Sequence, residues 1–393
     1  MAITRKASLL VKGGRVFDPI TRTFSREDVR VQDGKIRQRS AGLVAAADEE
    51  IFAAEDTLVV PGLVDFHLHC FRYGFVLGID ADHLAPAAST TTVVDGGSSG
   101  SLNFLAFREY VIKPSVTRIL AFLNISAIGQ TSVGGTGVDF AENDDDRLLD
   151  VASAVEVIEK NREFLVGVKV RAYTGLKSLT ALARARQAAD TAHVPMMVHI
   201  ASGPPHFADV LPFLRAGDIV THLYHGGGDA LVDQHGRVRE VFREARARGI
   251  EFDLGLDRIH TDFTVARAGL GQGFAPDYLS TDLTISNRHV TVDMPTTLSK
   301  LVALGLPLEA ALVGATSAPA RKLGRDQEFG TLSIGSEADL GILKRQEGPC
   351  AFHDTYGNTI HAEERLVPIA TIRHGSVLSP EDRETIRYDF VIK

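Results

Sequence analysis

The sequence predicts an α/β protein: a (β/α)8 TIM barrel with a small β-sandwich domain formed from both chain ends. Three observations support this fold class. Eight short apolar runs alternate with helix-like segments, strand-and-turn patterns lie at the two ends, and the 393 residues suffice for a barrel of roughly 250 residues plus a smaller unit. We therefore expect residues 1–57 and 329–393 to form the sandwich and residues 58–328 to form the barrel.

The first end of the chain reads as short strands joined by tight turns. Residues 8–18 hold two apolar segments around a Gly-Gly turn, and residues 29–37 repeat the pattern around an Asp-Gly turn. Strand-like texture returns at residues 330–343 and 370–377. The simplest arrangement packs the two ends together as one β-domain beside the barrel.

The middle of the chain has the alternation typical of βα units. Helix-like segments, such as residues 150–162, 180–191 and 240–248, separate the apolar runs, and Gly249 is placed to end the third of these helices. Eight repeats favour a closed barrel over an open doubly wound sheet, which usually has fewer strands. The eight runs are residues 59–69, 90–95, 118–125, 164–170, 194–200, 218–223, 250–255 and 278–282.

Composition limits the partners and the compartment. Hydrophobic residues make up 44% and charged residues 23% of the chain, as in soluble globular proteins, and the net charge of -8 argues against a nucleic-acid partner. The two cysteines, Cys70 and Cys350, exclude a disulfide framework. Without a signal peptide or an apolar stretch of ~18 residues, we expect a cytoplasmic protein without a membrane partner; a homo-oligomer remains open.

His67 and His69 are the most informative pair in the sequence, because they end the first apolar run. Side chains alternate along a strand, so these two imidazoles point to the same side. Two imidazoles that converge in this way form half of a metal site.

Four more potential ligands fall at the ends of later runs. Lys169 lies on the fourth, His199 on the fifth, His222 on the sixth and Asp282 on the eighth. In a barrel, the carboxyl ends of the strands converge on one face, where such folds place their active sites. The sequence therefore predicts a metal-dependent active site at that face.

Other histidines and acidic residues are weaker candidates. Asp262 and Asp277 compete with Asp282, but only Asp282 ends a strand-like segment, and Asp253 and Asp257 receive no role. Lys177, the rival of Lys169, lies past the strand among loop residues. The histidines that fall in predicted loops, and are not expected to bind metal directly, are His206, His225, His260 and His289.

With these motifs the chain resembles the amidohydrolase superfamily of metal-dependent hydrolases, and within it the dihydroorotase-like and amidohydrolase/deacetylase branch. The resemblance rests on residues 61–69, on the ligand series, and on residues 315–324 and 330–340. It implies two divalent ions, usually zinc. His67, His69 and Asp282 would hold one ion, His199 and His222 the other, and Lys169 would bridge them as a carbamate.

A bridging lysine needs a chemical change, because an ammonium group does not bind a cation. Burial and neighbouring cations favour the neutral amine of Lys169, which can add carbon dioxide. The resulting carbamate offers two oxygens and a negative charge, which suits two ions about 3.5–4 Å apart. Asp282 is the expected catalytic residue, taking a proton from the attacking water and passing it to the leaving group.

The substrate is expected to be a small anion. Dihydroorotases of this lineage typically carry an arginine two residues after the second metal histidine, but here Phe71 occupies that position and Arg72 follows. A slip of one residue faces the opposite side of an extended segment. Arg171 shares a strand face with Lys169 and is the second candidate for a carboxylate-binding residue, although either arginine can equally form a surface ion pair.

The expected reaction is hydrolysis of an amide or ester bond in an N-acyl or O-acyl acid, with dihydroorotase-type cleavage of a cyclic amide as the alternative. A deaminase of the same superfamily generally uses one metal and lacks the bridging lysine. A dihydropyrimidinase-like scaffold protein would show gaps in the ligand series, and this chain has none. The number of bound ions separates these classes.

Overall fold

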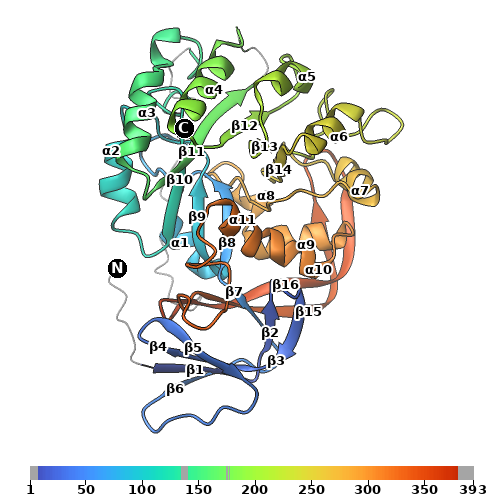
Figure 1. Cartoon of the computed structure of the whole chain (residues 1–393). Coiled ribbons are helices and arrows are strands. Elements are labelled where there is room, and N and C mark those ends of the chain that lie inside the picture. The colour runs from blue at the N-terminus through green and yellow to red at the C-terminus, as the bar shows by residue number, and fades with distance from the viewer. Residues whose placement is uncertain (1–7, 134–139, 174–175, 177, 379–393) are drawn as a thin grey trace, which may run out of the picture.

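The computed structural model describes residues 8–133, 140–173, 176 and 178–378. Within them, one parallel sheet forms the barrel and two further sheets form a domain built from both chain ends (Figure 1). The predicted fold class is therefore confirmed.

The end domain has a four-stranded and a six-stranded sheet. The first has the order β5-β4-β1-β6, with β1 Ser8–Lys12, β4 Asp28–Gln32, β5 Lys35–Ser40 and β6 Glu50–Ala53. The second has the order β17-β16-β15-β7-β2-β3, with β2 Arg15–Asp18, β3 Thr23–Arg26, β7 Leu58–Pro61, β15 Leu340–His353, β16 Thr359–Arg373 and β17 Ser376–Leu378. The predicted Asp-Gly turn joins β4 and β5, and both of its residues, Asp33 and Gly34, have positive φ angles of 52° and 73°.

The two sheets share one apolar core. Leu9 and Val31 of the smaller sheet pack in the same buried cluster as Val59 and Ile342 of the larger sheet. Strands from both chain ends thus bury each other's apolar faces, as two packed sheets must.

The barrel strands run parallel and pair in the order of the sequence. They are β8 Leu63–Leu68, β9 Thr90–Asp95, β10 Arg118–Asn124, β11 Leu165–Ala172, β12 Met196–Ile200, β13 Ile219–Thr221 and β14 Glu251–Asp253. The predicted eighth run closes the barrel through isolated parallel bridges, Asp253 to Tyr278 and Leu68 to Leu283. We call residues 278–283 the closing segment.

The first predicted run, residues 59–69, is divided between the two domains. β7 ends at Pro61 and pairs with β15 and β2 of the end domain, whereas β8 begins the barrel at Leu63. Gly62 lies at the crossing, where a Cβ atom would stand 2.2 Å from the Thr91 hydroxyl. The passage from one domain to the other cannot be recognised in the sequence, because both strands are fully buried and the apolar run is continuous.

Helices cover the outside of the barrel (Figure 1). The longer ones are α3 Val151–Lys160, α4 Thr180–Ala192, α6 Glu240–Ala247, α7 Phe263–Gly271, α9 Met294–Ala303, α10 Leu308–Gly314 and α11 Ser317–Lys322. Short helical turns are α1 Ala81–Leu84, η1 Pro86–Ala88, α2 Phe104–Phe107, η2 Arg108–Ile112, η3 Asp146–Leu148, α5 Phe207–Val210, η4 Leu211–Phe213 and α8 Arg288–Thr291. None of the helices in the described ranges is long and apolar enough to cross a bilayer.

The predicted helices agree with α3, α4 and α6 to within a few residues at their ends. Asp150 caps α3 by accepting a hydrogen bond from the Ser153 amide at 3.1 Å. Gly249 follows α6 with a φ of 83°, the left-handed conformation that commonly ends helices.

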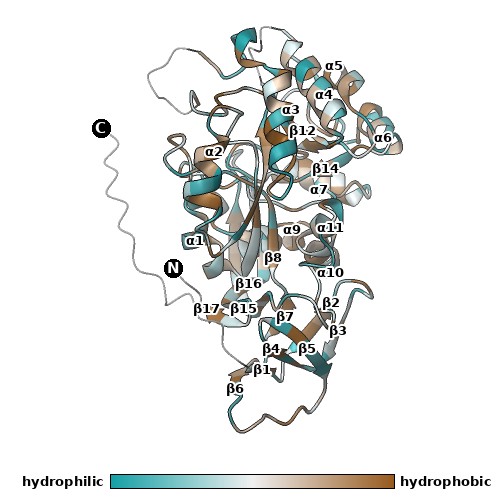
Figure 2. Ribbon diagram, turned by 60° about the vertical axis from the view of Figure 1, so that its left-hand side comes forward, coloured by the Kyte–Doolittle hydropathy of each residue, from teal (hydrophilic) through white to brown (hydrophobic). Residues whose placement is uncertain are grey.

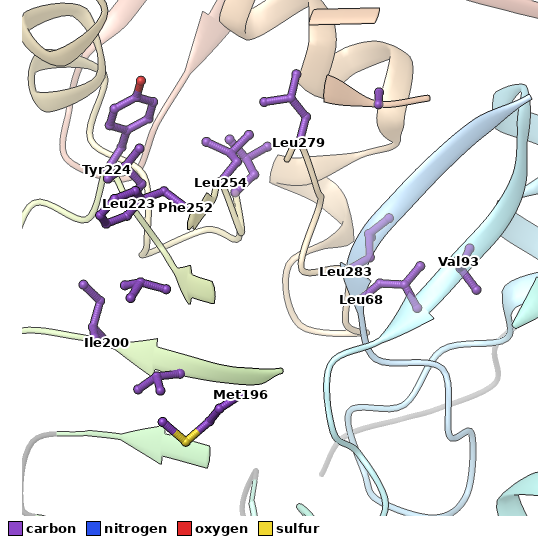
Figure 3. Packing of buried hydrophobic residues seen from close by; sticks show 14 of the residues in the cluster. Leu68, Val93, Met196, Ile200, Leu223, Tyr224, Phe252, Leu254, Leu279 and Leu283 are labelled. Atoms are coloured by element: carbon purple, nitrogen blue, oxygen red, sulfur yellow. The ribbon is translucent and has the colours of Figure 1, made fainter. Parts of the chain in front are cut away.

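The barrel core fills the space between strands and helices. Figure 3 shows side chains of this buried cluster, with Leu68 and Leu283 on one side of the view and Met196, Ile200 and Phe252 on the other. Hydrophilic colour in Figure 2 marks the outer faces of helices such as α3 and α6. This packing fixes the strand ends on which the site is built.

The β15–β16 hairpin joins the two domains. It leaves the six-stranded sheet and rises beside α9 toward α7 (Figure 1). Phe352, Ile360 and Leu366 on this hairpin pack in the barrel's core cluster, and the Leu366 amide donates a 2.8 Å hydrogen bond to the Ser299 hydroxyl. The hairpin is therefore part of both domains.

A buried ionic network reinforces the same junction. Arg373 donates from Nη1 to both oxygens of Asp339 at 2.8 Å, and Arg118 on β10 donates to Asp339 at 3.1 Å and to Glu337. Burial alone would raise the pKa of Asp339, but the two guanidinium groups outweigh it and hold that pKa below its usual value.

Removing one partner from this network should destabilise the protein. We expect Arg373→Met to lower the free energy of unfolding by about 3 kcal/mol, because it leaves Asp339 buried with Arg118 as its remaining guanidinium partner. The matched control is Arg345→Met, which removes the exposed ion pair with Glu364 and should cost less than about 1 kcal/mol. Denaturant unfolding of both variants measures the difference, and equal losses would contradict the assignment.

Candidate metal centre

All six predicted ligands meet at the carboxyl ends of the barrel strands. His67 lies on β8, Lys169 on β11 and His199 on β12, while His69 and His222 directly follow β8 and β13. Asp282 lies in the closing segment, and all six are buried, with at most 7% of each residue exposed.

The first group of potential ligands is His67, His69 and Asp282. The Nε2 atoms of His67 and His69 lie 3.5 and 3.2 Å from Asp282 Oδ1. That carboxylate oxygen is buried and has no hydrogen-bond partner among the described residues. One ligand atom from each residue lies within 4.8 Å of the others, a spacing that one cation can span.

Neighbouring hydroxyls fix which nitrogen of each ring faces the site. The Thr221 hydroxyl donates to Asp253 at 2.7 Å, so it accepts the Nδ1 proton of His67 at 3.0 Å. The Ser98 hydroxyl donates to Asp95 at 2.7 Å and accepts from His69 Nδ1 at 2.9 Å. Both rings therefore present an unprotonated Nε2 to the centre, as metal-binding histidines do.

The second group is His199, His222 and His260. The Nδ1 atom of His222 donates to the Gly255 carbonyl at 2.9 Å, which leaves its Nε2 facing His199 Nδ1 at 2.7 Å. The ring of His260 lies 4.0 Å from that of His222 and 5.0 Å from that of His199, measured between centroids. Their nitrogens also lie within 4.8 Å of one another.

Lys169 is fully buried beside the first group. Its Nζ atom lies 3.1 Å from His67 Nε2 and 3.4 Å from Met197 Sδ. Among the described residues, none brings a carboxylate oxygen within ion-pairing distance of this nitrogen. Burial, the largest influence, lowers the pKa of Lys169 to about 8.

The protonation states suit divalent cations. Burial lowers the pKa of His67, His199 and His222 well below the usual value and lowers that of His69 to about 4. The rings are therefore neutral near pH 7, the form that binds metals. The neutral imidazoles and a buried carboxylate oxygen without a hydrogen-bond partner form a set of ligands that fits hard or borderline divalent ions.

The backbone is unusual at two of these positions. His222 and Asp282 have φ angles of 72° and 51°, a region that non-glycine residues seldom adopt. Such strain tends to accumulate at functional sites, where the surrounding structure enforces it.

Asp253 was given no role by the sequence, yet it organises the first group. One oxygen, Oδ2, lies 3.2 Å from His67 Nδ1 and accepts from Thr221, and the other accepts from Ser280 at 2.6 Å. Asp253 ends the seventh strand, as the predicted ligands end theirs. This position at a strand end is the sequence feature that could have assigned Asp253 to the site.

The remaining predictions fall in different places. His260 was expected to lie outside the ligand set, but the structure brings it against His199 and His222. His206 and His289 are exposed and His225 is buried, and none of these three belongs to a cluster of potential ligands within the described ranges. Lys177 lies outside the described residues.

The two arginines have different surroundings. Arg171 Nη1 donates to Glu142 Oε1 at 2.8 Å, and with Glu142 and Tyr173 it lines a cavity of about 410 Å³. Arg72 donates to Asp80 at 3.0 Å and lies over the exposed Tyr73 ring. Arg171 pairs in register with His199, so it stands beside the second group of ligands.

Comparisons with known proteins agree with this geometry. The model of the Amidohydrolase family matches residues 58–377. A deacetylase of Agrobacterium fabrum is 32% identical over 86% of this chain and 82% of its own length. A crystal structure of a dihydroorotase superposes with a TM-score of 0.86 at 30% identity, covering 95% of this chain and 98% of that one. A crystal structure of an adenine deaminase gives the same TM-score at 28% identity, covering 94% and 99%.

Gly96 offers a direct test of how His67 is held. A Cβ atom there would stand 2.3 Å from His67 Nε2. We expect Gly96→Ala to push the ring aside and to weaken metal binding on the order of 10- to 100-fold, as misplaced ligands do. Metal titration against a competing chelator measures this affinity. Gly228→Ala is the control, because a Cβ at Gly228 meets no atom within 4 Å; equal affinities in the two variants would contradict the expectation.

Proposed function

The chain belongs to the amidohydrolase family, and from that premise we propose that it is a binuclear metal-dependent hydrolase of a small acyl acid. It is a deacetylase-like amidohydrolase, and the bond we propose is the amide or ester of an N-acyl or O-acyl acid. The observation that carries the proposal is the pair of neighbouring ligand groups with Lys169 buried beside them.

The two ligand groups support two ions. His67, His69 and Asp282 would hold one, and His199 and His222 the other. Bound divalent ions, zinc being the expected ones, supply Lewis acidity toward a carbonyl oxygen and make water a better nucleophile. The protein's part is to hold neutral imidazoles in fixed tautomers through Thr221, Ser98 and Gly255.

We propose that Lys169 carries a carbamate that bridges the two groups. The buried amine has a pKa of about 8, so a sizeable neutral fraction exists at neutral pH. A neutral amine adds to carbon dioxide, forming one N–C bond and releasing one proton. The product has the negative charge that the ammonium lacks, and it relieves the cost of a cation buried without a close carboxylate.

Asp282 is the proposed proton carrier of the reaction. Burial, the largest influence, raises its pKa well above the usual value, with Asp257 adding to the rise. Its buried Oδ1 atom has no hydrogen-bond partner among the described residues, so this oxygen is available to a cation or to a proton. Asp282 would take a proton from the attacking water and deliver it to the leaving nitrogen or oxygen.

Arg171 is the proposed partner of the substrate carboxylate. It lines the cavity described above and pairs in register with His199, and Glu142 holds one end of its guanidinium group. A guanidinium group binds carboxylates through paired hydrogen bonds. Arg72 is also ion-paired, with Asp80, but it is not among the residues that line this cavity, so we favour Arg171.

Cyclic-amide hydrolysis of the dihydroorotase type is the second candidate, favoured by the crystal structure of a dihydroorotase at 30% identity. A deaminase would bind one ion, and a scaffold protein none. Metal analysis and a substrate screen separate these functions. The zinc-loaded enzyme should hold about two ions per chain and hydrolyse members of a library of N-acyl and O-acyl acids, which is screened alongside dihydroorotate and adenine. Turnover of adenine alone, or no bound metal, would refute the proposal.

The carbamate predicts a dependence on carbon dioxide. Zinc reconstitution of the chelated protein should be faster and more complete with bicarbonate than in degassed, bicarbonate-free buffer. Lys169→Arg should show no such difference, because a guanidinium group does not form the adduct. Metal content and activity against time measure both. A wild-type protein that is indifferent to bicarbonate would contradict the bridging role.

The carboxylate partner predicts a difference between the two arginines. Arg171→Met should lower kcat/KM for acidic substrates about 10- to 100-fold, the loss expected for a charged hydrogen bond. The same variant should change kcat/KM much less for methyl esters of those acids. Arg72→Met, the comparison variant, should stay near wild type. Unchanged kcat/KM in both variants would remove the arginines from substrate binding.

A further inference from the structure

His260 comes from a loop, not from a strand end. Residues 254–262 connect β14 to α7 without regular structure, yet only 14% of the His260 side chain is exposed. Its ring lies against those of His222 and His199 at 4.0 and 5.0 Å. The loop that carries this imidazole is supported by contacts from another part of the chain.

That support comes from the tip of the β15–β16 hairpin, residues 354–358. Thr355 donates from its hydroxyl to the Arg258 carbonyl, and Tyr356 donates to the Ile259 carbonyl at 2.6 Å. The Tyr356 oxygen also accepts from the Gly226 amide at 3.2 Å, in the loop that follows His222. These contacts fix the backbone on the N-terminal side of His260.

The same tip fixes the backbone on the other side. Asp354 accepts from the Phe263 amide at 2.8 Å, and Asn358 donates to Asp262 at 3.1 Å. The tip is itself braced, because Asp354 also accepts from the Tyr356 and Asn358 amides at 2.9 and 2.8 Å. His260 therefore sits in a short stretch of chain that is held at both ends by the other domain.

We propose that His260 is a third imidazole ligand of the ion held by His199 and His222, and that the hairpin tip positions it. The inference rests on the proposed two-ion function and adds one ligand to it. The ligand nitrogens of the three rings lie within 4.8 Å of one another, as in the first group. Together with the proposed Lys169 carbamate, this ion would have four protein ligands, and a substrate atom could add a fifth.

The arrangement gives the end domain a part in metal binding. Phe352 and Ile360 anchor the hairpin in the barrel core, and the base of the hairpin belongs to the six-stranded sheet. The hairpin thus connects the six-stranded sheet to the loop of His260 and fixes where that loop lies relative to the sheet. Tyr356 is a positioning residue in this scheme, because it acts only through that loop.

The test measures the affinity of each ion with zinc and cobalt as probes, using the full-length protein and a competing chelator. His260→Ala should weaken one of the two ions by about 100-fold or more and leave the other unchanged. The visible spectrum of the cobalt-loaded protein should change, because one nitrogen ligand is lost. Tyr356→Phe, which keeps His260, should weaken the same ion about 10-fold.

Two control variants separate this role from general destabilisation. His353→Asn removes an exposed imidazole of the same hairpin, and Glu364→Gln removes a surface ion pair along it. Both should keep the two wild-type affinities. Two wild-type affinities and an unaltered cobalt spectrum in His260→Ala would overturn the ligand assignment, even if kcat/KM fell. Wild-type affinities in Tyr356→Phe would overturn the positioning role.

Failure of the inference is distinct from failure of the proposed function. If wild-type protein binds two ions and hydrolyses acyl acids while His260→Ala binds both ions as tightly, only the inference is wrong. If wild-type protein binds no ion, the proposed function fails and the ligand assignment fails with it.

Discussion

The backbone pairing between β8 and the closing segment is the constraint on which the centre depends. Asp282 donates its amide to the His67 carbonyl at 2.6 Å, and the His69 amide donates to the Leu283 carbonyl at 3.0 Å. Asp65, on the same strand, accepts from the Thr281 amide at 2.9 Å. These bonds lock the first strand and the last segment of the barrel together, so that both histidines face one carboxylate. The left-handed backbone of Asp282 is then the cost of turning that carboxylate inward.

A layer of buried polar groups behind the ligands also holds them in place. Asp253 lies 3.2 Å from His67 Nδ1 and binds hydroxyls from two further strand ends, Thr221 and Ser280. Burial, the largest influence, raises the pKa of Asp253 to about 6, which those hydroxyl donors limit. A partly satisfied buried network is costly, so each member is tied to its neighbours. The rings of the ligands are consequently oriented before any ion binds.

The sequence predicted the fold and the positions that converge, because period-two alternation and the ends of parallel strands are local and topological properties. It did not predict the split of residues 59–69 between two domains, because both halves are buried and equally apolar. Nor did it identify His260. That residue reaches the site through contacts with a hairpin about a hundred residues later in the chain, and no local periodicity reports a contact of that kind.

The end domain therefore also contributes to the metal centre. Its sheet contains β7, which leads through Gly62 directly into the strand of His67, and β15–β16, whose tip holds the loop of His260. The end domain is thus connected to both groups of ligands: β7 precedes the strand of His67, and the hairpin tip contacts the loop of His260. Domains that share a buried core and an ionic junction, here Arg118, Asp339 and Arg373, do not move freely. The position of the His260 loop is accordingly set by the contact between domains as well as by the barrel.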